Sequence, residues 1–345
     1  MKLGRQRARR LVRLTVVSLF VASLPIAANA VAQSDPPKSI PSWTTLKAAV
    51  SASSQITRAP AASTISPPPK SSELWWRSIN PAITSAARLG CNLQDSTITV
   101  PSSPETKCAY GDLNASRTLL LTGDSNATMW IPAFDTWGFQ SHWKVLTLTH
   151  SGCPPWKRPW LPGSKRLPGG VTVAGCETWR QAVLKSAKSF NPLIVVPVGL
   201  SVATTSPNSV TQTQLTVALK SALTEIKRAG LKPVTLDPMP SFPLASGPLD
   251  CLFTRSNSLT SCEVSTSSLG LSKLNTAYAA ATRATSVPLT ATRSMFCGPS
   301  KCPLLVKLGT TNYLVYQDGY HMTHQYSQIL GTALGTALAP YLPKN

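Results

Sequence analysis

The sequence has no long hydrophobic run. Its longest apolar stretch, Leu14–Ala27, is too short to span a membrane comfortably, and no other segment could cross a bilayer. Six basic residues precede this stretch, and Ala28-Asn29-Ala30 follows it. A basic start, a short apolar core and a small-residue end predict a secretory signal over residues 1–30, with an uncleaved anchor as the alternative. We therefore expect a secreted, extracytoplasmic protein.

Acidic residues are scarce. The chain has 13 Asp and Glu against 33 Lys and Arg, and without the six basic residues of the signal 27 remain, a net charge of +14. The long-range field of a basic domain attracts polyanions such as cell-wall polymers and anionic lipid head groups, which predicts association with the wall or membrane. The alternative is that the charge mainly serves solubility. Basic residues cluster no more tightly than in the pairs Lys157-Arg158 and Lys165-Arg166, so we expect no nucleic-acid partner.

Closely spaced cysteine pairs, which zinc sites favour, are almost absent. Of the eight cysteines only Cys297 and Cys302 come near the usual spacing, and no second pair does. We therefore expect neither a metal site nor another cofactor. In an exported chain eight cysteines indicate disulfides, although the sequence alone leaves their pairing open. We favour pairing between neighbours along the chain: Cys91–Cys108, Cys153–Cys176, Cys251–Cys262 and Cys297–Cys302.

Residues 31–75 contain little that could build a core. The stretch is rich in Ser, Ala, Pro and Thr, a composition typical of a tether, and only Trp43–Val50 fits one or two helical turns. We expect the ordered domain over residues 76–345, beginning with a helix over Ile79–Leu89. No internal repeat is visible.

A strand that turns sharply into a helix is predicted at Thr118–Trp130. Three leucines between threonines indicate a short buried strand, which ends in Gly123-Asp124-Ser125 before a helical pattern begins. Such a turn lies at the carboxyl edge of a sheet, where open α/β sheets bind ligands. The Ser125 hydroxyl would there be placed to attack a carbonyl, with helix N–H groups near the oxyanion. The alternative is an ordinary helix N-cap serine.

A nucleophilic serine needs a base, and the base needs an acid that fixes its tautomer. The chain has only four histidines, and one of them, His321, follows Asp318 by three residues at a predicted strand-to-helix junction. Both side chains could therefore face one cleft. An isolated pair of this kind is more often a loop or cap feature, but Ser125 upstream favours the catalytic interpretation. His150, at the end of a predicted strand, is a rival base.

Gly-Asp-Ser early and Asp-x-x-His late resemble the signature of the SGNH (GDSL-type) hydrolases. The chain is most similar to the extracytoplasmic SGNH domain of acyltransferase-3 proteins, because Cys153-Pro154-Pro155, further cysteines and Asp318-Gly-Tyr-His321-Met-Thr323 follow in the same order. The resemblance covers about residues 76–345, and it also suggests, as the alternative to a tether, that the region before them wraps onto the domain. It implies a three-layer α/β/α, flavodoxin-like fold with a mainly parallel sheet and disulfide-stapled loops. It also implies catalytic roles for Ser125, Asp318 and His321.

The resemblance also implies an oxyanion hole. The backbone amides of Ser125 and Gly152 are the donors carried over from the family. An asparagine common after the third strand is missing, because Gly199-Leu200-Ser201 stands there. Ser201, the Gly199 amide or Asn126 beside the nucleophile are the candidates to replace it.

The remaining pattern predicts alternating strands and helices, which favours a parallel sheet between helical layers. The further strands expected are 143–149, 192–199, 231–236, 304–308 and 311–316. The further helices expected are 177–191, 212–229, 270–285 and 325–341, with a Pro/Ser-rich rim loop over 237–266. Trp156 and Trp160 lie in a Pro-rich loop near the expected cleft, where their rings could stack on sugars or pack in the core.

Three functions remain open from the sequence. The resemblance favours O-acetylation of an envelope polysaccharide or glycolipid through an acyl-serine, with a membrane acyltransferase supplying the acyl group in trans. The absence of a fused membrane part favours a secreted esterase, either a deacetylase or a lipase-like enzyme. The third is a wall-binding module without activity. We expect a monomer in each case.

Overall fold

The structure, a computed structural model, describes residues 40–69, 90–93, 96–167, 170–199, 210–242, 247–266 and 272–343. The helix expected over 79–89 and the signal lie outside these residues. Among the described residues, no helix has the length and apolar character that crossing a bilayer requires.

Strand β4, Thr118–Gly123, lies inside a mainly parallel sheet. Its three leucines are completely buried, as expected of a strand covered on both faces. It pairs in parallel with β5, Lys144–His150, and with β6, Ile194–Val198. On the other edge of β5, β2 (Asn92–Leu93) adds in parallel and β3 (Ala109–Gly111) adds antiparallel. The predicted strand at 231–236 shrinks to β7, Thr235–Leu236, which pairs in parallel with β9, Leu289–Thr290.

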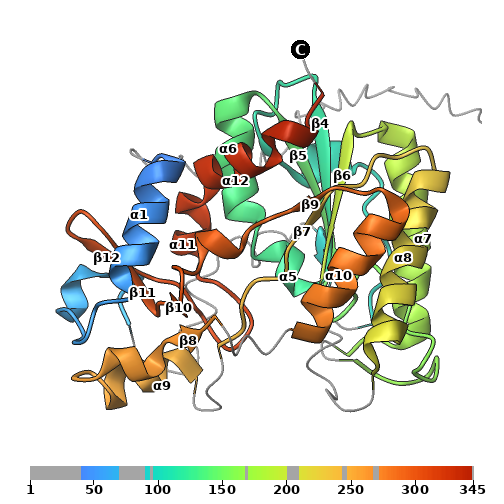
Figure 1. The fold of residues 1–345 in the computed structure, drawn as a ribbon. Coiled ribbons are helices and arrows are strands. Elements are labelled where there is room, and N and C mark those ends of the chain that lie inside the picture. The colour runs from blue at the N-terminus through green and yellow to red at the C-terminus, as the bar shows by residue number, and fades with distance from the viewer. Residues whose placement is uncertain are drawn as a thin grey trace, which may run out of the picture. The chain divides into compact units, whose positions relative to one another are not determined.

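Helices cover both faces of this sheet, which gives the predicted three layers (Figure 1). One layer contains α6 (Ile131–Ser141), α11 (His324–Ile329) and α12 (Gly331–Leu338). The other contains α7 (Val173–Phe190), α8 (Gln212–Arg228) and α10 (Ser272–Thr285). The expected closing helix over 325–341 is broken between α11 and α12, and its end is the 3₁₀ turn Ala339–Tyr341. Gly331 and Gly335 let α12 approach α6, because a Cβ at either would collide with Thr136 or Trp137.

The expectation of a tether is wrong for residues 40–69. Helix α1, Trp43–Ser53, buries Leu46 and Val50 completely, and β1, Ile65–Ser66, pairs in parallel with β12. Composition averaged over the stretch hides this apolar pair, which lies one helical turn apart and forms a single face. The ordered domain therefore begins before residue 76.

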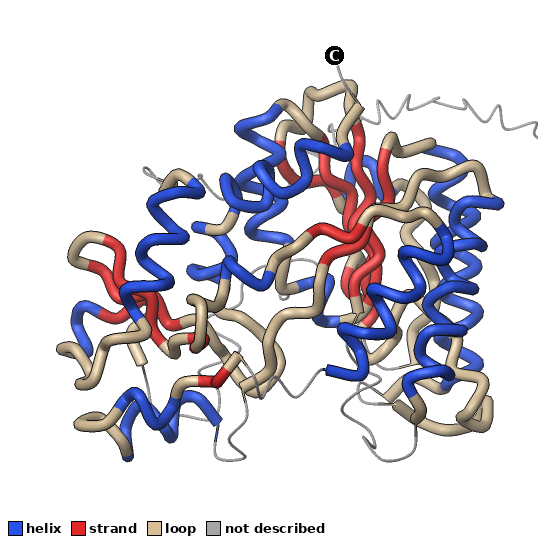
Figure 2. Tube along the Cα trace, in the orientation of Figure 1, coloured by secondary structure: helices blue, strands red, loops and turns tan. Residues whose placement is uncertain are grey.

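The strands that lead to Asp318 also differ from expectation. β11 (Leu305–Leu308) and β12 (Thr311–Leu314) form an antiparallel hairpin that joins β1 in a separate three-stranded sheet beside α1 (Figure 2). The expected rim loop over 237–266 contains α9, Gly247–Thr254, and a short strand β8, Val264–Ser265, which pairs with β10, Lys301–Cys302. A short helix, α4, covers Pro104–Lys107.

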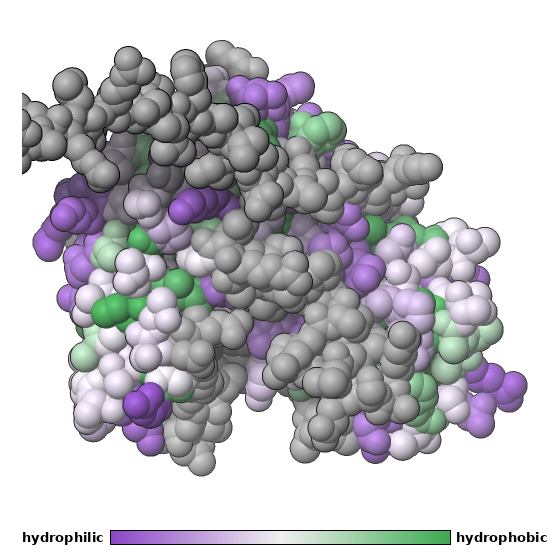
Figure 3. Space-filling view, turned by 180° about the vertical axis from the view of Figure 1, so that it is seen from behind, coloured by the Kyte–Doolittle hydropathy of each residue, from purple (hydrophilic) through white to green (hydrophobic). Residues whose placement is uncertain are grey.

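Four disulfides join the neighbouring pairs that we favoured: Cys91–Cys108, Cys153–Cys176, Cys251–Cys262 and Cys297–Cys302. Each closes a loop of the kind that a crosslink stabilises by restricting the unfolded chain. On the face that Figure 3 shows, the described hydrophilic residues lie at several separate places with apolar residues between them.

Candidate active site

The end of β4 requires a glycine. Gly123 has φ +143°, and a Cβ there would lie 1.7 Å from the carbonyl oxygen of Val198 in β6. The next residue, Asp124, caps α5 (Ser125–Thr128) and accepts a hydrogen bond from the Asn126 N–H at 2.9 Å. Ser125 is the first residue of this helix, so its amide has no acceptor one turn earlier. The strand-turn-helix predicted from the sequence therefore places the Ser125 hydroxyl at the carboxyl edge of the sheet.

The structure brings Ser125, His321 and Asp318 together. His321 Nε2 lies 2.8 Å from Ser125 Oγ, although 196 residues separate the two. His321 Nδ1 lies 2.8 Å from Asp318 Oδ2 and 3.0 Å from Oδ1. The turn that bears both residues is held by the N–H groups of Tyr320 and His321, which donate to Asp318 Oδ1 at 2.7 and 2.9 Å. This serine, base and acid are in the order that nucleophilic acyl transfer requires.

The charges of the site favour a basic imidazole. Burial lowers the pKa of His321, but the Asp318 carboxylate and the more distant Asp124 raise it above its ordinary value overall. Burial raises the pKa of Asp318, whereas the charge of His321 and the hydrogen bonds from the turn bring it below its ordinary value. Each group therefore favours the charged form of the other, and the carboxylate stabilises the imidazolium that forms when the base takes a proton.

The predicted oxyanion donors lie at the same edge. Gly152 is the third residue of a turn closed by a hydrogen bond from Cys153 N–H to the His150 carbonyl at 3.0 Å. Its φ of +77° is the left-handed conformation that a type II turn requires at this position. Asn126 is buried and lies directly after Ser125 in α5. Ser201 lies outside the described residues.

Space explains why no asparagine stands at position 199. A Cβ on Gly199 would lie 2.6 Å from Pro155 Cδ and 3.0 Å from the Trp156 ring. The Gly199 carbonyl accepts a hydrogen bond from the Tyr278 hydroxyl at 3.1 Å. The Cys-Pro loop therefore occupies the room that a side chain after β6 would need.

The expectation for Trp156 is corrected by this packing. Its ring is 2% exposed and makes an edge-to-face contact with Tyr278 at 5.8 Å between centroids, so neither face is available to a sugar. Trp160 is half-buried against the same cluster, and its role in binding stays a prediction. His150, the rival base, is completely buried, and its ring nitrogens face the backbone carbonyls of Ser151 and Thr97. Its ring is therefore placed to support the backbone.

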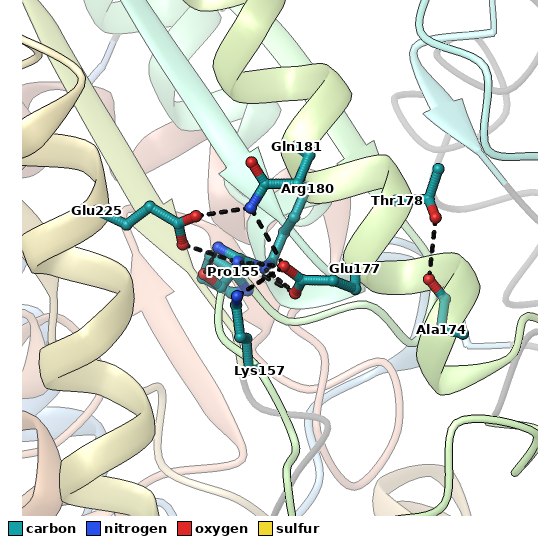
Figure 4. Close-up of polar contacts among 8 residues, drawn as sticks. All are labelled: Pro155, Lys157, Ala174, Glu177, Thr178, Arg180, Gln181 and Glu225. Atoms are coloured by element: carbon teal, nitrogen blue, oxygen red, sulfur yellow. Dashed lines mark hydrogen bonds and ion pairs between the residues drawn. The ribbon is translucent and has the colours of Figure 1, made fainter.

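Two buried arginines hold the loop that follows β5, and neither was predicted from the sequence as a functional residue. Arg158 is 4% exposed and donates to the Gly152 carbonyl at 2.9 Å. Burial lowers the pKa of Arg158 to about 10, and nearby Asp124 opposes that shift. Arg180 of α7 donates to the Pro155 carbonyl at 3.3 Å and to Glu225 of α8 at 2.8 Å (Figure 4). The signal available in the sequence was the position of Arg158 within the Cys-Pro segment.

The rest of that network is formed by Glu177, Lys157 and Gln181 (Figure 4). Burial raises the pKa of Glu177 and of Glu225, but Arg180 and the hydrogen bonds around it bring both below the ordinary value. α7 and α8 are thus joined at Glu225 by the buried Arg180 guanidinium and by Gln181, and the guanidinium also anchors the loop between β5 and α7.

Comparison with known proteins gives a consistent result. Residues 90–335 match the family described as "SGNH domain (fused to AT3 domains)". No curated protein matches the chain in sequence. A similar solved structure is the periplasmic domain of a lipopolysaccharide acetyltransferase from Salmonella ser. Paratyphi A, with a TM-score of 0.54, 14% identity, and coverage of 77% of this chain and 98% of that chain. A GDSL-like lipase from Bacteroides thetaiotaomicron VPI-5482 has a TM-score of 0.40, 12% identity, and coverage of 76% and 98%.

Proposed function

The chain belongs to the SGNH domain family, whose domains are described as fused to AT3 domains, and it is an SGNH-type enzyme. We propose that it transfers an acyl group, most simply acetyl, to a hydroxyl of a cell-envelope polysaccharide or glycolipid. The observation that carries the proposal is the 2.8 Å contact between His321 Nε2 and Ser125 Oγ, with Asp318 on the other ring nitrogen. The alternative product, a free acid, arises when water replaces the sugar hydroxyl.

The reaction proceeds in two halves. His321 Nε2 takes the proton of Ser125 as Oγ attacks the carbonyl carbon of the donor ester, and Asp318 stabilises the imidazolium. The carbonyl oxygen becomes an oxyanion, which accepts hydrogen bonds from the amides of Ser125 and Gly152 and from the side chain of Asn126. The ester C–O bond breaks, the leaving oxygen receives the proton from His321, and Ser125 carries the acyl group.

The second half repeats these steps with the acceptor. His321 takes the proton of the acceptor hydroxyl while the hydroxyl oxygen attacks the acyl carbon. The bond to Ser125 Oγ breaks, and the serine recovers the proton from the imidazolium. Every step uses the same three side chains, so the nature of the acceptor decides between transfer and hydrolysis.

Two observations support an extracytoplasmic site of action. Four disulfides within the described residues are typical of an oxidising compartment. The net charge of +14 that remains without the signal favours encounter with anionic envelope polymers or lipid head groups. A membrane acyltransferase acting in trans would supply the acyl group, in keeping with the domain's fusion to AT3 domains elsewhere.

The test is to incubate the purified chain with p-nitrophenyl acetate, with and without envelope polysaccharide, and to measure nitrophenol release and acetyl esters on the glycan. Transfer predicts that the glycan becomes acetylated and that Ser125→Ala abolishes both signals. If all the acetyl is released as free acetate and none is found on the glycan, the enzyme is a hydrolase instead. If there is neither turnover nor covalent labelling at Ser125, the enzyme is not acting through this site, and a binding module becomes the better description.

A further inference from the structure

The turn at the end of β5 is held at two successive carbonyl groups. His150 Nδ1 lies 2.9 Å from the Ser151 carbonyl oxygen, and Arg158 Nη2 donates to the Gly152 carbonyl oxygen at 2.9 Å. His150 Nε2 lies 2.8 Å from a third carbonyl oxygen, that of Thr97. Because a carbonyl oxygen can only accept, each ring nitrogen forms its bond only when it carries a proton, so the two bonds form together only in the imidazolium form. Both side chains are buried, so these bonds form away from competing water.

The Ser151 carbonyl and the Gly152 N–H belong to the same peptide unit. In a trans peptide these two groups point in opposite directions, so a donor that fixes the carbonyl also fixes the N–H. The hydrogen bond from His150 further polarises the peptide, which makes the Gly152 N–H a stronger donor. At φ +77° Gly152 has the freedom to let this peptide flip, and the bond from Arg158 to the next carbonyl opposes such a flip.

The turn is also held from outside by one face of α7. Cys176 forms the disulfide to Cys153, Trp179 makes an edge-to-face contact with the His150 ring at 5.5 Å, and Arg180 donates to the Pro155 carbonyl. These three residues have the i, i+3, i+4 spacing that places side chains on a single helix face. The backbone from residue 150 to 155 is therefore fixed much more firmly than a surface turn.

We propose that His150 and Arg158 are the positioning residues of the oxyanion hole, which hold the carbonyls of Ser151 and Gly152 so that the Gly152 N–H keeps its direction and donor strength. The inference rests on the proposed function, in which Gly152 is an oxyanion donor. It gives this chain a rigid, polarised amide in the absence of an asparagine after β6, where Pro155 and Trp156 leave no room. Neither residue touches the substrate.

Two amide variants of His150, both of which lose the ring that contacts Trp179, separate this role from packing. The amide nitrogen of His150→Asn takes the place of Nδ1 and can still donate to Ser151, whereas that of His150→Gln takes the place of Nε2 and reaches only Thr97. Each variant loses one of two hydrogen bonds, so a purely structural role predicts similar effects. The proposal predicts kcat within about threefold of wild type for His150→Asn and a loss of about 10²-fold for His150→Gln, with KM unchanged in both.

Two variants of Arg158 provide an independent test. Arg158 lines a cavity of about 220 Å³ with Pro154, Leu161 and Val173. Neighbouring side chains can therefore shift to accommodate a substituted side chain at position 158. We expect Arg158→Met to lower kcat by about 10–100-fold and Arg158→Lys, which keeps a donor, to recover part of that loss. Controls are His142→Asn and Arg117→Met, because His142 bonds Asp112 and Arg117 donates to the Ser141 carbonyl beyond the opposite end of β5. Both should retain wild-type rates.

The readouts are kcat and KM for p-nitrophenyl acetate, thermal unfolding, and the second-order rate of Ser125 labelling by a fluorophosphonate, whose phosphoryl oxygen needs the same donors. Equal losses, or no loss, in the two His150 variants would overturn the inference while wild-type labelling still upholds the proposed function. If His150→Gln does not fold, the Arg158 pair decides: unchanged kcat in Arg158→Met overturns the inference. A wild-type chain that is not labelled at Ser125 overturns the proposed function and this inference with it.

Discussion

Replacing Asp318 by asparagine changes one charge and almost no volume. The asparagine oxygen can still accept from the N–H groups of Tyr320 and His321, as Asp318 Oδ1 does at 2.7 and 2.9 Å. Its amide nitrogen then faces His321 Nδ1 and donates to it. The ring must in response carry its proton on Nε2, which points at Ser125 Oγ, and it can no longer act as a base.

The magnitude follows from losing the tautomer and the charge together. We expect kcat to fall by about 10³–10⁴-fold, the size of effect that this change produces where an aspartate orients a catalytic imidazole. The pH profile should move as well. In the wild type, burial lowers the pKa of His321. The carboxylates of Asp318 and Asp124 outweigh this effect and raise the pKa overall, so the acidic limb of kcat/KM should lie above about 6.5. Without the carboxylate, burial dominates and the limb should shift to lower pH.

The assay is hydrolysis of p-nitrophenyl acetate between about pH 4 and pH 9, with kcat/KM fitted at each pH. Asp112→Asn is the matched control, because Asp112 Oδ2 lies 2.9 Å from the Nδ1 of exposed His142 and forms the same kind of pair on the surface. It should leave both the rate and the limb unchanged. An Asp318→Asn variant that keeps its rate within about tenfold, or keeps the acidic limb in place, would refute the reasoning.

Three further variants test the framework around the site. Gly123→Ala places a Cβ 1.7 Å from the Val198 carbonyl, and we expect a loss of about 3–6 kcal/mol in the free energy of unfolding, measured by urea titration. Arg180→Met leaves two partly exposed carboxylates without their shared partner, so thermal unfolding at neutral pH should show a loss of about 2 kcal/mol that shrinks as they protonate. Replacing Cys153 and Cys176 together by serine should lower the free energy of unfolding by about 3 kcal/mol. This variant should also lower kcat, and by more than removal of any of the other three disulfides. Stability equal to wild type in any of the three would contradict the packing described.

The sequence by itself determined the local elements and the chemistry they carry. Three leucines before Gly123 can bury both faces of a strand, a glycine at φ +143° permits the approach of β6, and Asp124 caps the helix that begins at Ser125. These are short-range preferences of backbone and side chain, which any chain with this sequence expresses. The pairing of neighbouring cysteines was only favoured on the same local grounds, and the structure shows it.

The tertiary structure decided which distant groups meet and which side chains are buried. Residues 40–69 have the composition of a tether, yet α1 and β1 bury Leu46, Val50 and Ile65, because the hairpin of β11 and β12 offers a matching apolar surface. Trp156 lies in a loop rich in proline, and only the position of Tyr278 shows that its ring is covered. Burial is a property of what the rest of the chain places nearby, and local pattern does not contain it.

The same reason separates the active-site residues from the groups that support them. A serine, an aspartate and a histidine can be recognised from their motifs, because their chemistry is in the side chain. His150 and Arg158 act through the carbonyl groups they reach, and those contacts exist only once β5, its turn and α7 have packed together. A sequence names the reactive groups, and the fold decides which backbone atoms are held to serve them.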